Sequence, residues 1–255
     1  MEALQEIQGK LDEVDIVVVG IGEEFTFSTE DYKNTKVGKR YMEDIGVEKI
    51  PDVIKALAMQ ELGCEPYIKA YNKLAELLNG KTYFINTLNT DDIIFQSELK
   101  KDRITAPCGS LKRMQCNEGC DNAIFEGEHL LNQVYHYWYE TGMPWQEAKP
   151  ECENCRHEIV PNTIHASCYL EQGYMDSWLE YKSWLQKVLD KKVCVLELGV
   201  GFAYPEVIRW PLERMVNVSD KAFFIRVNEK YPQLTKEIHG KGMSVNGNSL
   251  KILSE

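Results

Sequence analysis

Four cysteines in two close pairs form the first pattern with chemical meaning. Cys116 and Cys120 enclose three residues, and Cys152 and Cys155 enclose two. Two thiolates from one turn bind the same ion, and two such turns complete a tetrahedral shell of four sulfurs, which selects zinc or, less often, iron. A closed shell leaves no position for a substrate, so we expect a structural zinc ion here. The alternatives are small buried thiols or an iron–sulfur site.

Two glycine turns follow hydrophobic runs that are typical of buried strands. The glycines are Gly20 and Gly22 in "VVVGIGEEF", and Gly199 and Gly201 in "LELGVGF". Glycines at strand ends let the backbone approach a diphosphate closely, which favours a nucleotide-binding cleft. Glycine also ends strands for steric reasons alone. Glu23 and Glu24 follow the first turn and would repel a phosphate unless their carboxylates point away.

A third strand end carries a dense polar cluster. In the segment "INTLNTDD" the polar residues are Asn86, Thr87, Asn89, Thr90, Asp91 and Asp92. Enzymes of the α/β class place ligand contacts at the carboxyl ends of strands, whereas a turn that caps the next helix is the alternative. Because two amides and two carboxylates exceed what one cap needs, we interpret the cluster as functional.

The elements that must position these groups alternate between strands and helices. Hydrophobic, β-branched runs predict strands at 15–20, 81–87, 102–107, 192–199, 222–228 and, shorter, 243–247. Apolar residues at helical spacing predict helices at 4–14, 52–63, 66–80 and 174–192. This alternation predicts an α/β fold with a Rossmann-like, doubly wound parallel sheet.

Two segments, 25–52 and 112–159, do not fit the alternation, and the second holds the cysteine pairs. We interpret them as insertions at the edge of the sheet where ligands bind. We therefore expect a Rossmann-like domain formed by residues 1–111 and 160–255, with a helical insertion at about 25–80. A small zinc-binding and helical module would occupy residues 112–159.

The composition limits the partners and the compartment. The chain has 255 residues, 44% of them hydrophobic, and a net charge of −11, which argues against nucleic-acid binding. We interpret one local basic strip as a solvated face: Lys100, Lys101, Arg103, Lys112 and Arg113. No apolar run approaches the roughly 20 residues that span a membrane, and the acidic start does not resemble a signal peptide. We expect a cytoplasmic protein without membrane contact, where zinc explains paired cysteines better than disulfides do.

The order of these motifs resembles that of the sirtuin family. The segment "TLNTD" (87–91) is similar to the sirtuin motif T-Q-N-I-D, and Cys108 with Gly109 stands where sirtuins have His-Gly. The cysteine pairs resemble the sirtuin zinc ribbon, and "GVG" (199–201) resembles the sirtuin G-T-S. Asn228 ends a strand where sirtuins have a ribose-binding asparagine. The resemblance covers nearly the whole chain.

Among sirtuins, the chain looks closest to the bacterial macrodomain-linked branch, class M, whose members act mainly as protein ADP-ribosyltransferases. The resemblance implies NAD as the cofactor and a protein acceptor that enters between the sheet and the zinc module. Asp91 would hold the nicotinamide amide, and Asn89 would lie beside the ribose and an ordered water. The residues implied to contact the cofactor are Gly20, Gly22, Thr87, Asn89, Asp91, Gly199, Gly201 and Asn228.

Three functional hypotheses follow from the resemblance. In the leading one, the chain cleaves the nicotinamide–ribose bond and transfers ADP-ribose to a protein, with Cys108 as a weak base, a neutral spacer or a nucleophile. In the second, it is a lysine deacylase with an atypical base, for which His165 is a candidate, although we interpret this residue first as structural. In the third, it is a non-catalytic binding module, because the hydroxyls of G-T-S are replaced by Val200 and Gly201.

Overall fold

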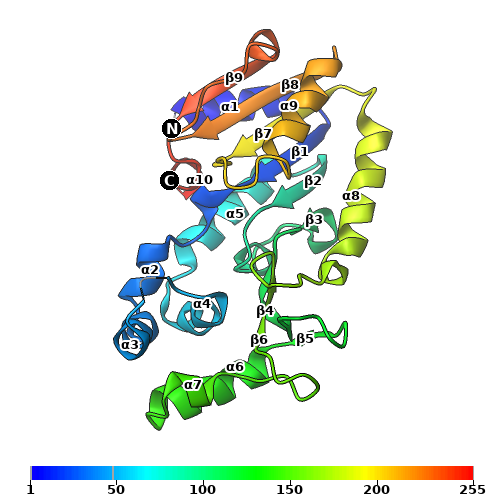
Figure 1. Cartoon of the computed structure of the whole chain (residues 1–255). Helices are drawn as coiled ribbons and strands as arrows, with labels where there is room; N and C mark the ends of the chain where they lie inside the picture. Colours follow the sequence, from blue (N-terminus) through cyan, green and yellow to red (C-terminus); the bar gives the residue numbers. More distant parts are fainter. Residues whose placement is uncertain (1, 48, 255) are drawn as a thin grey trace.

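A six-stranded, fully parallel sheet forms the larger part of the molecule (Figure 1). The structure is a computed structural model that describes residues 2–47 and 49–254. The strands of this sheet are β1 (Ile16–Ile21), β2 (Thr82–Thr87), β3 (Ile104–Thr105), β7 (Val193–Leu198), β8 (Ala222–Asn228) and β9 (Gly242–Asn246). Their spatial order is β3-β2-β1-β7-β8-β9. The predicted α/β class and parallel sheet are confirmed.

Helices cover both faces of the sheet, as alternating side chains require. On β1, Val17 and Val19 point into one hydrophobic cluster and Val18 into the other. The first cluster includes residues of α1 and α5, and the second includes residues of α8 and α9. These helices are α1 (Glu2–Asp12), α5 (Glu65–Leu77), α8 (Met175–Val188) and α9 (Arg209–Val218), and α10 (Ser249–Ser254) packs on α5.

The segment after β1 forms a helical arm. A 3-10 turn (Glu23–Phe25) leads into α2 (Thr29–Asn34), α3 (Lys36–Ile45) and α4 (Asp52–Ala58). Ser28 begins α2 with a capping box, in which its hydroxyl accepts from the Asp31 N–H and the Asp31 carboxylate accepts from the Ser28 N–H. Thr35 caps α3 with a single bond, in which its hydroxyl accepts from the Gly38 N–H at 2.9 Å. These short capped helices explain why the sequence showed only weak periodicity.

A small antiparallel sheet forms the lower part of the molecule in Figure 1, in the order β5-β4-β6. The strands of this sheet are β4 (Gly109–Cys116), β5 (Ile124–Glu126) and β6 (Ile159–Thr163). Between β5 and β6 the chain forms α6 (Glu128–Val134), a π-helix (Tyr135–Glu140) and α7 (Trp145–Ala148). Trp138 is fully buried against Tyr41 of α3, and its Nε1 donates to Asp44 at 2.8 Å. The helical arm and the small sheet therefore share one packed interface.

One predicted strand is shorter than expected. The run 102–107 forms only two strand residues, Ile104 and Thr105, because residues Lys101–Arg103 adopt a 3-10 turn.

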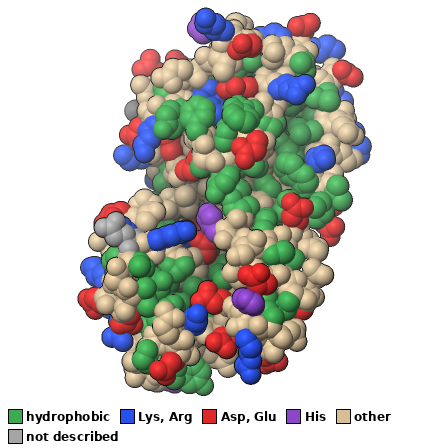
Figure 2. Space-filling view, in the orientation of Figure 1, with side chains coloured by type: hydrophobic (Ala, Val, Ile, Leu, Met, Phe, Trp, Pro, Cys, Tyr) green, Lys and Arg blue, Asp and Glu red, His purple; other side chains and the backbone are tan. Residues whose placement is uncertain are grey.

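In the space-filling view the surface is hollowed between the part built on the large sheet and the lower part (Figure 2). Across residues 2–47 and 49–254, no helix combines the length and apolar character that crossing a bilayer would require.

Candidate functional site

The order of the large sheet reverses between β1 and β7, which is the topological switch point where open α/β sheets bind ligands. The turns that follow these two strands lie against each other, with the Gly22 N–H donating to the Leu198 carbonyl at 2.9 Å. A side chain at Gly22 would overlap the Cα of Val200, and Gly199 has a φ of 62°. The glycines are thus required for one turn to pack on the other.

A cavity of about 570 Å³ opens at this switch point. Its walls come from the turns after β1, β7 and β8, from the start of α2 and from α10. Two basic side chains, Lys230 and Lys251, line it together with four acidic ones: Glu23, Glu24, Asp31 and Glu229. The predicted cofactor residues Gly199, Gly201 and Asn228 are part of the same wall.

Glu23 and Glu24 turn their carboxylates onto backbone amides of this wall. The Glu23 carboxylate accepts from the Gly201 N–H at 2.6 Å. The Glu24 carboxylate accepts from the Glu229 N–H at 2.8 Å and from the N–H and hydroxyl of Ser249, both at 2.6 Å. The donors are the kind that bind phosphate oxygens in nucleotide sites, and here they already hold anionic oxygens.

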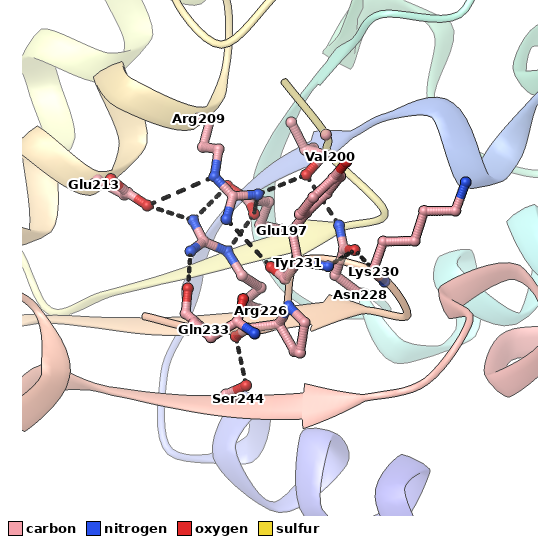
Figure 3. Close-up of polar contacts among 12 residues, drawn as sticks. Glu197, Val200, Arg209, Glu213, Arg226, Asn228, Lys230, Tyr231, Gln233 and Ser244 are labelled. Carbon is pink, nitrogen blue, oxygen red and sulfur yellow. Dashed lines mark hydrogen bonds and ion pairs between the residues drawn. The ribbon is translucent and has the colours of Figure 1, made fainter. Parts of the chain in front are cut away.

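Asn228 and Arg209 join the turns after β7 and β8 (Figure 3). The Asn228 amide donates to the Val200 carbonyl at 2.9 Å, and its oxygen accepts from the N–H groups of Lys230 and Tyr231 at 3.0 and 2.7 Å. Arg209 donates to the Val200 carbonyl at 2.7 Å and to the Tyr231 carbonyl at 3.2 Å. These bonds fix the backbone of the cavity wall, and they engage both polar atoms of the Asn228 side chain.

A buried charge network lies directly beneath that wall (Figure 3). Arg226 is fully buried and pairs with Glu197 at 2.5 Å, with Glu213 at 2.6 Å, and with the Gln233 carbonyl at 2.6 Å. Burial raises the pKa of Glu197, and the charge and hydrogen bonds of Arg226 oppose the rise. Arg226 and Glu197 are direct neighbours in the β7–β8 register. The sequence signal for this pair was one charge inside each of two hydrophobic strand runs.

Removing one partner of this network should be strongly destabilising. Arg226→Met leaves the fully buried Glu197 carboxylate without its nearest cation, and we expect the free energy of unfolding to fall by about 3–5 kcal/mol. The double variant Glu197→Leu/Arg226→Met should recover much of this loss, because it removes both buried charges. Chemical denaturation of the three proteins measures the effect. Equal stability of the single and double variants would contradict this role.

The loop after β2 is fastened to the segment after β1. The Thr87 hydroxyl accepts from the Asn89 N–H at 3.2 Å, and the Asn89 amide donates to the Phe25 carbonyl at 3.0 Å and to the Tyr71 hydroxyl at 3.4 Å. Thr87 and Asn89 are both buried. Two of the predicted site residues therefore hold the loop in shape and lie next to the glycine turn.

Asp91 is the most perturbed acid of this loop. Its carboxyl accepts from the Thr26 hydroxyl at 2.8 Å and from the Ile93 N–H at 3.0 Å, with only 2% of the residue exposed. Burial raises its pKa to about 6, although both hydrogen bonds act in the opposite direction. Among the ion pairs of the described residues, none involves Asp91. A buried carboxylate without a cation is typical of a group that awaits a ligand.

Cys108 is buried and belongs to the second hydrophobic cluster, to which α8 and α9 also contribute. Burial raises the pKa of its thiol to about 12, and the charges of Glu23 and Glu206 add to the rise. The thiol therefore stays protonated at neutral pH, which disfavours the nucleophile and the base among its three expected roles. The neutral spacer is the role that agrees with this environment.

His165, which we interpreted first as structural, has a hydrogen-bond partner and lies partly at the surface. Its side chain is 52% exposed, and its Nδ1 lies 2.8 Å from the Asp52 carboxylate. Burial acts to raise the pKa of Asp52, but the hydrogen bond with His165 and the charge of Lys55 outweigh it and hold the pKa well below its usual range. The sequence offered no signal for this pair, because its members are 113 residues apart.

The four predicted zinc ligands meet at the end of the small sheet. The sulfurs of Cys116, Cys120, Cys152 and Cys155 all lie within 4.8 Å of one another. The closest pairs are Cys116 with Cys155 at 3.4 Å and Cys120 with Cys152 at 3.5 Å. A tetrahedral zinc with bonds of about 2.3 Å places its sulfurs about 3.8 Å apart, so this donor set fits the ion. These residues would hold zinc as a structural centre.

Solved structures with the same arrangement of elements identify the fold. Sir2Tm bound to a propionylated peptide superposes with a TM-score of 0.57, covering 98% of this chain and 95% of that one at 15% identity. Sir2Af2 bound to a myristoylated histone peptide gives a TM-score of 0.58, with 99% and 94% covered at 15% identity. This chain has the sirtuin fold. The cysteine cluster lies in the smaller module of that fold.

Sequence relatives of this sirtuin-fold chain carry names from ADP-ribose chemistry. A "Protein ADP-ribosyltransferase" of Staphylococcus aureus (strain Mu50) is 25% identical over 251 residues, which cover 89% of this chain and 78% of that protein. A "Probable bifunctional ADP-ribose hydrolase/ADP-ribosyltransferase" of Fusarium oxysporum f. sp. cubense is 28% identical over 146 residues. The second match covers 55% of this chain and only 24% of that protein. No protein-family model matches the chain.

Proposed function

We propose that this chain binds NAD in the switch-point cavity, cleaves the nicotinamide–ribose bond and transfers ADP-ribose to a protein acceptor. The observation that carries the proposal is Asp91, a buried carboxyl with a raised pKa and no ion pair among residues 2–47 and 49–254, in the loop fastened to the segment after β1. A carboxylate in such a place suits a ligand that brings both an amide donor and a positive charge. The nicotinamide end of NAD brings both. The curated relative that aligns over most of the chain supports the same chemistry.

Asp91 lines a different cavity from the switch-point one, but its carboxyl accepts from Thr26, which lines the switch-point cavity. Asp91 would accept from the nicotinamide amide, and Asn89 and Thr87 would hold the loop beside the ribose. The backbone around the cofactor would come from Gly20, Gly22, Gly199, Gly201 and Asn228. The zinc ion would keep the smaller module in shape without contacting substrate.

The diphosphate would take the place of the two glutamate carboxylates. The N–H groups of Gly201, Glu229 and Ser249 already bind anionic oxygens, so their chemistry fits a phosphate. Binding would then require Glu23 and Glu24 to leave these amides. The ammonium groups of Lys230 and Lys251 at the same cavity would attract the diphosphate.

Two other functions remain as alternatives within the same fold. The structural neighbours were solved with acylated peptides, and deacylation would use such a peptide as the acceptor. A high thiol pKa removes Cys108 as a base for that reaction. A non-catalytic binding module is favoured by the carboxylates of Glu23 and Glu24, which fill the anion-binding amides. The relatives' names and Asp91 lead us to prefer transfer, in the manner of the macrodomain-linked branch.

Nicotinamide release from NAD distinguishes the three functions, which are ADP-ribosyl transfer, deacylation and non-catalytic binding. We expect the purified chain to release nicotinamide without any acylated peptide, because transfer and hydrolysis need none. Release that depends strictly on an acetyl-lysine peptide would support deacylation and contradict the transfer proposal. No release under either condition would leave the binding module as the function of this fold.

A further inference from the structure

A second cleft, which shares no lining residue with the switch-point cavity, contains groups that the proposed function has not used. It has a volume of about 290 Å³ and lies between α4 and the strand β6. Asp52 and His165 both line it, and Lys49, Lys55 and Glu158 are the other charged residues of its wall. The cleft contains none of the residues implied by the resemblance to hold NAD.

Asp52 and His165 are arranged as a base and the group that orients it. The Asp52 carboxylate accepts from the Thr163 hydroxyl at 2.5 Å and from Lys55 at 2.8 Å, and it lies 2.8 Å from Nδ1 of His165. A carboxylate can only accept, so Nδ1 of His165 carries a hydrogen, and in the neutral ring Nε2 is the nitrogen with a lone pair. The Tyr204 hydroxyl lies 3.4 Å from that Nε2.

The segment that leads to His165 pairs with Cys108 and Gly109, which stand where sirtuins have His-Gly. The Ile164 N–H donates to the Cys108 carbonyl at 3.1 Å, and Gly109 pairs with Thr163. His165 therefore follows directly after the backbone that touches Cys108. The imidazole at this end of the cleft is thus close in the fold to a thiol that stays protonated.

Tyr204 connects this cleft to the cofactor cavity. It follows Phe202 and Ala203, which line the switch-point cavity, and its hydroxyl contacts His165 in the second cleft. Burial raises the pKa of Tyr204, and nearby Cys108 and the charges of Asp52, Glu206 and Glu23 add to the rise. Within two residues, the chain therefore runs from Phe202 and Ala203 at the switch-point cavity to a side chain in contact with His165.

We propose that His165, oriented by Asp52, accepts the proton of the acceptor nucleophile during the proposed ADP-ribosyl transfer, at a site where Cys108 cannot. This inference rests on the proposed function. The nucleophile's proton passes to Nε2 as its freed electron pair forms the bond to the anomeric carbon of the ribose. The carbon–nitrogen bond breaks with its electron pair moving to the ring nitrogen, so neutral nicotinamide leaves. The imidazolium that results lies against the ionised Asp52, which stabilises it, and then returns its proton to solvent.

The test uses the full chain, NAD and methanol as a small surrogate for the acceptor. Formation of methyl ADP-ribose requires a proton to leave the nucleophile, whereas exchange of labelled nicotinamide into NAD requires none. His165→Gly should lower methanolysis and hydrolysis by about 100-fold and leave nicotinamide exchange and the KM for NAD nearly unchanged. Added imidazole should restore part of the lost rate, since it can occupy the vacated space. His239→Gly, at an exposed histidine outside both hollows, is the matched control and should behave as wild type with or without imidazole.

Each outcome decides the proposal. Asp52→Asn should lower methanolysis in the same way as His165→Gly, and imidazole should not rescue it. Equal methanolysis by wild type and His165→Gly, in a protein that still exchanges nicotinamide, would overturn the role of His165 and leave the proposed function standing. Loss of exchange and methanolysis together in a folded variant would show a structural role instead. Absence of both reactions in the wild type would refute the proposed function and this inference with it.

Discussion

Asp91→Asn should lower nicotinamide release by about 100- to 1,000-fold and at the same time make the protein more stable at pH 8. Activity falls because the amide cannot supply the negative charge that the proposed contact with the nicotinamide end requires. The KM for NAD and the rate of release in steady-state assays measure this part. Asp91 is the residue on which the proposed chemistry depends most directly.

The gain in stability follows from the raised pKa of Asp91. Its pKa is about 6 in the folded chain and near 3.8 when unperturbed, so the unfolded state loses its proton first as pH rises. The wild type therefore loses stability between about pH 4 and pH 6, and the full cost of roughly 3 kcal/mol persists above that window. Asn removes the charge but keeps only some of the hydrogen bonds with Thr26 and Ile93, so we expect a net gain of about 1–2 kcal/mol at pH 8.

Asp92→Asn is the matched control for this prediction. Asp92 is the next residue and has a φ of 60°, a conformation that asparagine adopts readily, and its carboxylate faces Ser110 instead of Thr26. Its nicotinamide release should remain near that of the wild type. The account of Asp91 is wrong if Asp91→Asn and Asp92→Asn have the same activity, or if the stability gain of Asp91→Asn is as large at pH 4 as at pH 8.

Loss of one zinc ligand should unfold the smaller module. We expect one zinc ion per purified chain and none in Cys152→Ser, because a tetrahedral site rarely survives with three of its four thiolates. Structural zinc contributes about 10–16 kcal/mol in small zinc-binding domains, more than the module can replace by packing. Elemental analysis gives the metal content, and limited proteolysis should show early cuts between residues 117 and 158 in the variant.

Cys168→Ser separates ligation from a general effect of cysteine loss. Cys168 is exposed and lies beside Gly119 near the cluster, but it is not one of the four sulfurs that meet. This variant should keep its zinc and the protease resistance of the wild type. Zinc retained in Cys152→Ser, or iron found in place of zinc in the wild type, would contradict the assignment of the site.

The sequence predicted the parts of the site whose signals are local. Strand runs that end in glycine or in polar residues placed the turns after β1, β2, β7 and β8 at one edge of the sheet, because parallel strands end together. Two short cysteine spacings predicted one cluster of four sulfurs, and the structure brings the four together. In both cases the information lies within a few neighbouring residues, where spacing fixes direction.

The parts that the sequence did not predict depend on contacts between distant residues. Glu24 bonds to Ser249, 225 residues away, so no local pattern indicated that its carboxylate would cover an amide. The same holds for Asp52 and His165, which the helical arm and β6 bring together. Cys108 is buried in a hydrophobic cluster built from several elements, among them α8 and α9. Packing between elements determined each of these environments.

Binding of NAD at the switch-point cavity tests the central claim most directly. The measurement is the melting temperature of the protein with and without millimolar NAD. It compares the wild type, Lys230→Glu in the cavity wall, and Lys182→Glu on the exposed face of α8, which is the control. At a hundred times its Kd, NAD should stabilise the wild type and Lys182→Glu by about 2.7 kcal/mol, and Lys230→Glu by less, since the reversed charge repels the diphosphate. No rise in melting temperature for the wild type, or an equal rise in all three proteins, would contradict the account.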